Sequence, residues 1–186
     1  MYWNENRKPA YLLLADGSIY EGVSIGKEGT AVGEAVFATA MVGYQELLTD
    51  QSYFGQLVIQ TFPLIGNYGV NSEDLESERC YLSGYIVREW CEIPSNFRCE
   101  GNVDEYLRAQ NIVGIADVDT RSLTRKIREV GVMNAVITTE NAYEQKEELL
   151  KKIEGCSIKR AIESTSCKQM QKFTCEHPKY HVALFD

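Results

Sequence analysis

The sequence has 186 residues, of which 44% are hydrophobic, and its 27 acidic and 19 basic side chains give a formal net charge of −8. A chain of this size buries roughly two-thirds of its unfolded surface, so a folded domain requires no disulfide or metal. The negative charge argues against a nucleic-acid partner, and no apolar run reaches the ~20 residues of a membrane span. Residues Met1–Glu5 contain no basic segment followed by an apolar one, so we expect no secretory signal and a cytoplasmic location.

The first half of the chain has the pattern of β-structure. Five short apolar or alternating stretches predict strands, at residues 11–15, 18–25, 31–39, 56–62 and 81–88. Asp16-Gly17 is typical of a hairpin turn between the first two strands. Pro63 ends the fourth stretch, because proline cannot donate a hydrogen bond to a strand ladder.

Helices enter in the second half of the chain, between further strands. Asn102 and Glu105 have the spacing of a capping box, which predicts a helix from there through Gln110. Residues 112–116 and 132–138 are apolar stretches of strand length. The sequence therefore predicts an α/β fold class.

Two more helices are marked by start and stop signals. Asp119 predicts the start of one helix and Gly131 its end, and Asn141 with Glu144 predicts the start of another that ends at Gly155. Apolar residues at helical spacing predict their buried faces, namely Leu123, Ile127 and Val130 on the first, and Leu149, Leu150 and Ile153 on the second.

The composition changes after the last predicted helix. We expect one α/β domain over residues 1–155 and a polar linker over residues 156–180. Residues 181–186 have the pattern of a buried strand, and a strand with nothing after it has no neighbour to pair with. We therefore expect it to open a further domain of a longer protein.

No catalytic group and no metal site is predicted. None of the six cysteines forms a Cys-x-x-Cys pair, and free thiols are the default in a reducing cytosol. Cys175, His177 and His181 lack the fourth ligand of a closed metal site. A nucleophilic cysteine on a strained turn needs glycine-rich flanks, which none of the six has. Cys156 follows Gly155 and is better explained as a helix end.

Several stretches resemble the small chain of carbamoyl-phosphate synthase. The most specific are Gly43-Tyr44-Gln45-Glu46-Leu47-Leu48-Thr49-Asp50-Gln51-Ser52-Tyr53 and Ile115-Ala116-Asp117-Val118-Asp119-Thr120-Arg121-Ser122-Leu123-Thr124-Arg125. Residues 31–37, 63–69 and 95–98 support them in the same order. Gln51 departs from the family, which often has proline there; this loosens the turn but keeps the serine hydroxyl.

The resemblance implies a fold and a function. The fold would be the layered β/β/α swivelling domain of the small chain, followed in the family by a glutaminase domain with a Cys-His-Glu triad. The function would be that of a non-catalytic assembly domain that packs on the large chain. The whole enzyme makes carbamoyl phosphate from glutamine, bicarbonate and ATP for arginine and pyrimidine biosynthesis, and the large chain uses the ATP and magnesium. No cofactor is expected in this domain.

Ser52 is the sharpest candidate for a site residue. From the residues alone, Asp50-Gln51-Ser52 predicts an ordinary self-capped turn. The resemblance implies that this serine reaches across to the glutaminase domain and contacts bound L-glutamine. A hydroxyl suits that role because it can both donate and accept a hydrogen bond.

Basic side chains and glycines mark two weaker candidates. Arg121 and Arg125 lie inside a resembling motif on the helix after Asp119. The basic face of this helix is an ordinary solvated surface, a phosphate-binding face or a docking face for an acidic surface of the large chain. Gly66 and Gly69 are better explained as turn residues than as a phosphate cradle, because the acidic stretch that follows does not suit an anion.

Two other functions stay open from the sequence. The first is a stand-alone partner-binding or regulatory domain without enzymatic activity. The second is an unrelated swivelling-domain enzyme. A coding sequence that continues into a glutaminase would favour the assembly domain, and turnover by the purified chain would favour the unrelated enzyme.

Overall fold

The fold is described by a computed structural model over residues 7–185. The expectation that Met1–Glu5 is no secretory signal lies outside the described residues, as does the last position of the strand predicted at residues 181–186. Among the described helices, none has the length and apolar character that crossing a bilayer requires.

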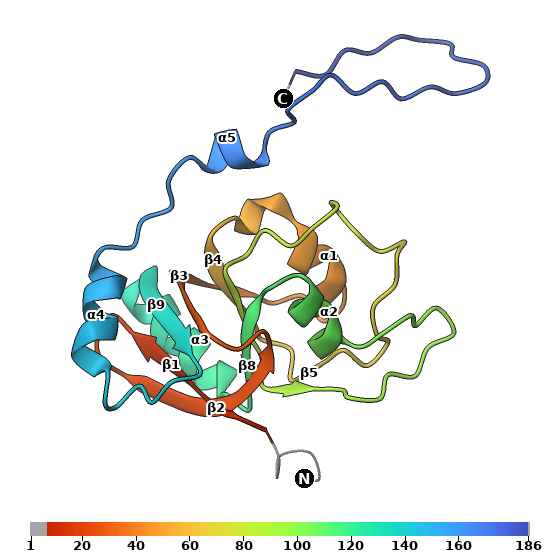
Figure 1. Ribbon diagram of the computed structural model, residues 1–186. Helices are drawn as coiled ribbons and strands as arrows, with labels where there is room; N and C mark the ends of the chain where they lie inside the picture. The colour runs from red at the N-terminus through yellow and green to blue at the C-terminus, as the bar shows by residue number, and fades with distance from the viewer. Residues whose placement is uncertain (1–6, 186) are drawn as a thin grey trace.

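A closed barrel of seven strands forms the centre of the molecule (Figure 1), with the order β1-β2-β8-β6-β4-β3-β9. The strands are β1 Pro9–Leu14, β2 Ile19–Gly26, β3 Thr30–Ala38, β4 Gln56–Gln60, β6 Gly84–Ile86, β8 Val113–Ala116 and β9 Met133–Thr138. β1 runs antiparallel to both β2 and β9, whereas β3, β4, β6 and β8 pair in parallel. The topology is thus mixed, and closure removes the sheet edges.

Alternation along the strands divides the core. Leu12 and Leu14 of β1 and Ile137 of β9 point into the barrel, where they join one fully buried apolar cluster. Leu13 and Val136, one residue out of step, face outward into a second cluster beneath a helix. The two-residue period of a strand therefore supplies both the barrel interior and the outer layer.

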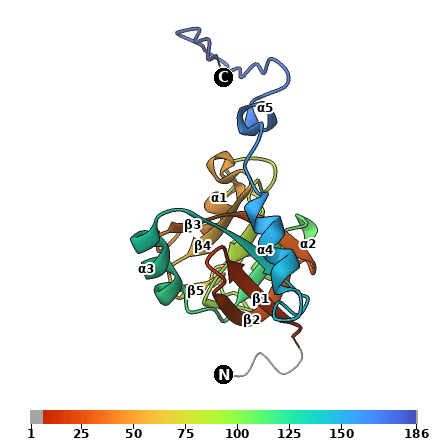
Figure 2. The same ribbon diagram turned by 90° about the vertical axis from the view of Figure 1, so that its left-hand side faces the viewer.

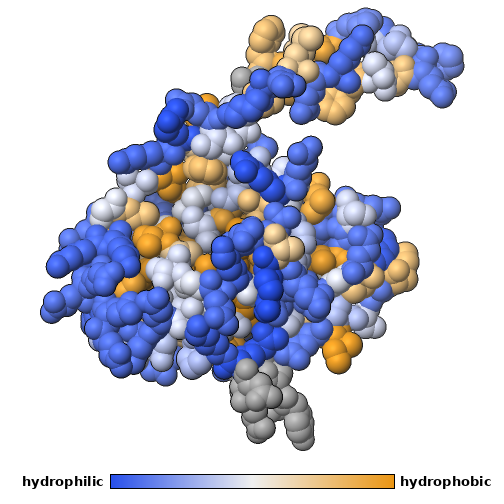
Figure 3. Space-filling view, in the orientation of Figure 1, coloured by the Kyte–Doolittle hydropathy of each residue, from blue (hydrophilic) through white to orange (hydrophobic). Residues whose placement is uncertain are grey.

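Helices cover the outside of the barrel (Figures 1 and 2). They are α1 Tyr44–Thr49, the 3₁₀ turn η1 Gln51–Tyr53, α2 Val103–Ala109, α3 Thr120–Val130 and α4 Lys146–Glu154. The short helix α5 Ala161–Thr165 lies apart from the barrel, on the segment that follows α4. α4 packs on β1, β3 and β9, α2 on β2 and β8, and α3 on β3 and β4. The outer side of α4 is hydrophilic (Figure 3), as expected for a helix with one face on the barrel.

Most of the predicted elements are confirmed. The hairpin turn at Gly17 has φ 84°, the backbone conformation that glycine adopts readily. Asn102 caps α2 by accepting a hydrogen bond from the Glu105 N–H, and Asp119 caps α3 in the same way through the Ser122 N–H. The α/β fold class predicted from the sequence is therefore correct.

Three predicted details are wrong. Val130 is 65% exposed because it is the last residue of α3 and lies beyond the part of the helix that packs on the barrel. α4 begins at Lys146 instead of Asn141, whose side chain accepts from the Tyr143 N–H and donates to Glu144 in a turn. The strand predicted at residues 81–88 is only three residues long, as β6.

Four short elements were not predicted. They are α1, α5, and the two-residue strands β5 Leu64–Ile65 and β7 Glu89–Trp90, which form a small parallel sheet of their own. None is long enough to show a clear periodic pattern in the sequence. They are recognised only from their contacts in the folded structure.

The predicted linker leaves the barrel after α4. Cys156 follows Gly155, the C-cap of α4, and its N–H donates to the Ile153 carbonyl at 3.1 Å, so the interpretation of Cys156 as a helix end is confirmed. Its carbonyl accepts a hydrogen bond from the Asn134 side chain. Beyond α5 the chain extends away from the barrel (Figures 1 and 2). Residues 181–185 form no strand, since the described residues offer them no hydrogen-bonded neighbour. That this segment opens a further domain stays a prediction.

Candidate functional site

Ser52 lies on the surface in the 3₁₀ turn that follows α1. Asp50 organises this turn, since its Oδ1 accepts from the Ser52 N–H at 2.8 Å and its carbonyl accepts from the Tyr53 N–H at 3.2 Å. The self-capped turn predicted from Asp50 is thus confirmed. Within residues 7–185, the exposed Ser52 hydroxyl forms no hydrogen bond. The turn therefore presents a free donor and acceptor to solvent.

Helix α1, which leads into this turn, is held at its start by two tyrosines. Gly43 precedes it with φ 79° and provides no side-chain cap. The Tyr68 hydroxyl takes that role by accepting from the N–H groups of Gly43 at 2.9 Å and Tyr44 at 3.4 Å. The Tyr44 hydroxyl in turn donates to the Gly69 carbonyl at 2.5 Å, and the two rings stack with centroids 4.2 Å apart.

Burial fixes the protonation state of this tyrosine pair. Desolvation raises the pKa of Tyr44 and of Tyr68, so both phenols stay neutral at physiological pH. A neutral phenol keeps its proton for donation, as Tyr44 requires toward Gly69. Gly66 and Gly69 have φ 85° and 76° and form a tight turn, so their interpretation as turn residues is confirmed.

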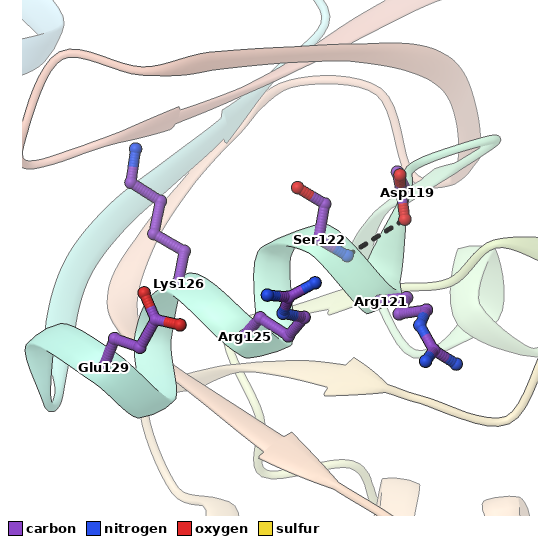
Figure 4. A pocket seen from close by; sticks show the side chains of 6 residues that line it. All are labelled: Asp119, Arg121, Ser122, Arg125, Lys126 and Glu129. Atoms are coloured by element: carbon purple, nitrogen blue, oxygen red, sulfur yellow. Dashed lines mark hydrogen bonds between the residues drawn. The ribbon is translucent and has the colours of Figure 1, made fainter.

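Helix α3 carries the second candidate site (Figure 4). Asp119, Arg121, Ser122, Arg125, Lys126 and Glu129 line a shallow pocket of about 350 Å³ along one side of the helix. Lys126 is engaged with Asp16, at 2.6 Å, and with the Ser18 hydroxyl. Arg121 and Arg125 are exposed, and neither has an ion pair within the described residues. The two guanidinium groups are therefore available to an acidic group.

The cysteines show no sign of an activated nucleophile. Burial raises the pKa of the Cys80 thiol to about 11, which is opposite to the shift that a thiolate nucleophile needs. His177 and His181 lie in the exposed segment beyond α5. Across residues 7–185, no three His, Cys, Asp or Glu side chains gather in a way that could hold a metal ion.

Comparison with known proteins identifies the family. The family model for the carbamoyl-phosphate synthase small chain, CPSase domain, matches residues 12–137. The small chain of carbamoyl phosphate synthase from Clostridium perfringens is 43% identical over 95% of this chain and 50% of its own length. That from Vibrio cholerae is 55% identical over 70% of this chain and 34% of its own length.

The barrel and its helices define a mixed α/β domain that presents the Ser52 hydroxyl on its surface. The described part of the domain contains no metal-binding cluster. The chain belongs to the carbamoyl-phosphate synthase small chain family and matches its CPSase domain. It spans half or less of the length of the relatives described above. One solved structure, an aminopeptidase from Aneurinibacillus sp. strain AM-1, covers 69% of this chain and 30% of its own at 13% identity, and its TM-score of 0.39 is too low to indicate a common fold.

Proposed function

We propose that this chain is the assembly domain of a glutamine-hydrolysing carbamoyl-phosphate synthase small chain and that it contributes Ser52 to the glutamine site. In this proposal the domain has the layered β/β/α swivelling fold and works beside a glutaminase domain. The small chain forms a cytoplasmic heterodimer with a large chain that uses ATP, magnesium and bicarbonate. The product would feed arginine and pyrimidine biosynthesis.

The observation that carries the proposal is the presentation of Ser52. Its turn lies inside the most specific family motif, its hydroxyl is exposed, and a buried helix end holds it in place. An ordinary surface serine would need none of this support. A hydroxyl fixed at the surface can bind the carboxylate or ammonium group of an amino acid held by a neighbouring domain.

Ser52→Ala in the complete two-chain enzyme tests this role. We expect the KM for glutamine to rise about tenfold, the equivalent of about 1.4 kcal/mol for a lost hydrogen bond to a charged group. Synthesis from added ammonia should be unchanged, because ammonia bypasses the glutamine site. Ser72→Ala is the control, since the exposed Ser72 hydroxyl donates to Glu100 and does not touch the turn. A glutamine KM equal to that of the unmodified enzyme would reject the assignment.

We place the large chain against α3 because its arginines have no partner within the described residues. Arg121 and Arg125 are one helical turn apart, so their guanidinium groups can meet one acidic surface together. Arginine suits such a contact because its planar donors pair with carboxylates in a bidentate way.

Charge reversal tests the docking face. The double variant Arg121→Glu, Arg125→Glu should weaken association with the large chain at least tenfold, measured by gel filtration of the mixed chains at several concentrations. Arg128→Glu is the matched control, because Arg128 is exposed on the same helix but outside the pocket. Equal co-elution of the double variant and the control would move the interface elsewhere.

A further inference from the structure

The acid-rich segment between the Gly66–Gly69 turn and β6 supports helix α1 as well as connecting two parts of the chain. Residues 71–79, here called the clamp loop, form bends and contain no helix or strand. Asn71 orders it locally, since its Oδ1 accepts from the N–H groups of Glu73 and Asp74, both at 2.9 Å. Arg98 pairs with Asp74 and, at 3.7 Å, with Glu73. The loop therefore has a fixed shape although it carries several like charges.

The clamp loop grips the start of α1 through a fully buried carboxamide. Gln45 is 0% exposed, and its Oε1 accepts from the Asn71 N–H at 2.9 Å while its Nε2 donates to the Asn71 carbonyl. Both backbone polar groups of Asn71 are thus paired with both polar groups of one side chain. Removing either partner would leave buried groups without hydrogen bonds.

A second contact grips the end of α1, one residue before the Ser52 turn. Thr49 is also 0% exposed, and its hydroxyl accepts from the Glu76 N–H at 2.9 Å and faces the Gln45 and Glu46 carbonyls, each at 3.1 Å. The Ser77 hydroxyl donates to the Thr49 carbonyl. The clamp loop therefore holds Thr49 through its side chain and its backbone together.

This double contact matters because α1 cannot fix its own position. It has six residues, far fewer than the ~12 that an isolated helix needs for even marginal stability in water. Asp50, which organises the Ser52 turn, follows Thr49 directly and donates its N–H to the Leu47 carbonyl at 3.3 Å. Any movement at Thr49 is therefore passed to Ser52.

We infer that the clamp loop positions Ser52 for its ligand and that Thr49 is the positioning residue. The inference rests on the proposed contact between Ser52 and glutamine, and it extends that site to a segment without secondary structure of its own. A displacement of about 1 Å at a contact group is enough to lower the rate of a positioned reaction by about a hundredfold. Leu47 and Leu48 pack α1 on the apolar core, and the contacts of Thr49 oppose such a displacement at the end of the helix that leads to Ser52.

The first experiment measures the turn itself in this chain and does not depend on any activity. Thr49→Val keeps the side-chain volume but removes the hydroxyl that accepts from the Glu76 N–H and donates to the Gln45 and Glu46 carbonyls. Thr49→Ser keeps this hydroxyl. By ¹⁵N relaxation, we expect the backbone order parameters of Ser52 and Tyr53 to fall from about 0.85 to below about 0.6 in Thr49→Val and to stay high in Thr49→Ser. Thr124→Val is the matched control, because the buried Thr124 hydroxyl has no hydrogen-bond partner within the described residues.

A milder variant decides the matter if Thr49→Val does not fold. Ser77→Ala removes the bond to the Thr49 carbonyl and a 3.2 Å contact with the Arg79 carbonyl inside the loop, but it leaves the Thr49 hydroxyl and its bonds in place, so we expect a smaller fall in the same order parameters. Its control is Ser72→Ala, in the same loop, whose hydroxyl faces Glu100 instead of α1. Order parameters that remain at the unmodified value in Thr49→Val, or in Ser77→Ala if that variant is the one that folds, would overturn the inference.

The second experiment joins the clamp to function in the complete enzyme. Thr49→Val should raise the KM for glutamine about tenfold while ammonia-dependent synthesis keeps its kcat, and Thr49→Ser should restore the KM. A loosened turn with a normal KM in both Thr49→Val and Ser52→Ala would refute the glutamine contact of Ser52 and leave the clamp itself standing. A raised KM in Ser52→Ala but not in the loosened Thr49→Val would refute the positioning role.

Discussion

Helices α1 and α3 each present a candidate site and each pack apolar side chains into the core, but they are capped in opposite ways. α3 has eleven residues, its cap Asp119 directly precedes it, and Leu123 and Ile127 fasten it to the barrel core. α1 has six residues, and its start is capped by the Tyr68 hydroxyl from a separate turn. The first is a helix with a local cap, and the second is a shorter helix whose cap comes from a distant part of the chain.

The difference separates the two kinds of site. The arginines on α3 are long, charged and unpaired within the described residues, so they can reach a partner over several orientations. Ser52 has a short side chain, so its hydroxyl can act only where the backbone places it. Hydrogen bonds from distant residues hold α1, where the position of Ser52 is critical. A local cap is enough for α3, whose long arginine side chains can adjust to a partner.

The largest expected effect comes from breaking the anchor of α3. Leu123 is 0% exposed and belongs to the barrel cluster, so Leu123→Ala should lower the free energy of unfolding by about 2–5 kcal/mol. Val130→Ala on the same helix should change it by less than about 0.5 kcal/mol, because Val130 is 65% exposed. Urea unfolding of both variants checks this, and equal losses would contradict the assigned anchor.

The distant cap of α1 should contribute nearly as much. Tyr68→Phe keeps the stacked ring but removes the acceptor for the Gly43 and Tyr44 N–H groups. Leaving buried donors unpaired costs about 1–3 kcal/mol, which we expect as the loss in urea unfolding. A loss within error would show that water replaces the phenol and that α1 does not depend on this cap.

The local cap of α3 gives the matched comparison. Asp119→Ala removes the acceptor for the Ser122 N–H, 3.0 Å away, and should cost about 1 kcal/mol. Asp119→Ser should recover most of that loss, because serine is an equally good cap. If Asp119→Ala instead cost more than Tyr68→Phe, the local cap of α3 would matter more than the distant cap of α1, and the comparison would be reversed.

The same distinction explains what the sequence could predict. α3 was predictable because its cap, its buried residues and its terminal glycine follow one another within the helix. α1 was not, because its partners are the Tyr68 hydroxyl and the backbone of Asn71, more than twenty residues away. Hydrogen bonds between segments so far apart in the chain leave no local pattern in the sequence, unlike the caps of α2 and α3, which lie three residues from their partners.

In the barrel and in the candidate sites, too, local features could be predicted from the sequence and long-range contacts could not. Alternation and turn glycines were enough to predict β1, β2, β3 and β9, and Asp50 was enough to predict the Ser52 turn. Barrel closure was not predictable, because the parallel pairing of β3, β4, β6 and β8 depends on crossovers through loops and helices. The clamp loop was excluded as an anion site for its charge, and its support of α1 became apparent only from its contacts.

The smallest effect concerns Lys126, the α3 base that pairs with Asp16. Partial burial acts to raise the pKa of Asp16, but hydrogen bonds from Lys126 and Ser18 outweigh it, so the pKa lies below its ordinary value. A carboxyl group with a lower pKa in the folded state stabilises the fold above its unfolded pKa and loses that contribution as the pH falls. Lys126→Met should therefore cost a few tenths of a kcal/mol at about pH 7, as expected for an ion pair that is only partly shielded from solvent.

The pH dependence distinguishes this ion pair from simple packing by the lysine stem. The deficit of Lys126→Met in urea unfolding should begin to shrink as the pH falls to about 4, near the ordinary Asp16 pKa of 3.8 in the unfolded chain. It should close as the pH falls through the lower pKa of folded Asp16, because Asp16 is then protonated in both proteins. Asp16→Asn should show the same convergence, since it removes the other charge of the pair. A deficit that persists unchanged at about pH 3 would mean that Lys126 stabilises α3 through its aliphatic stem, which would make it one more anchor of that helix beside Leu123.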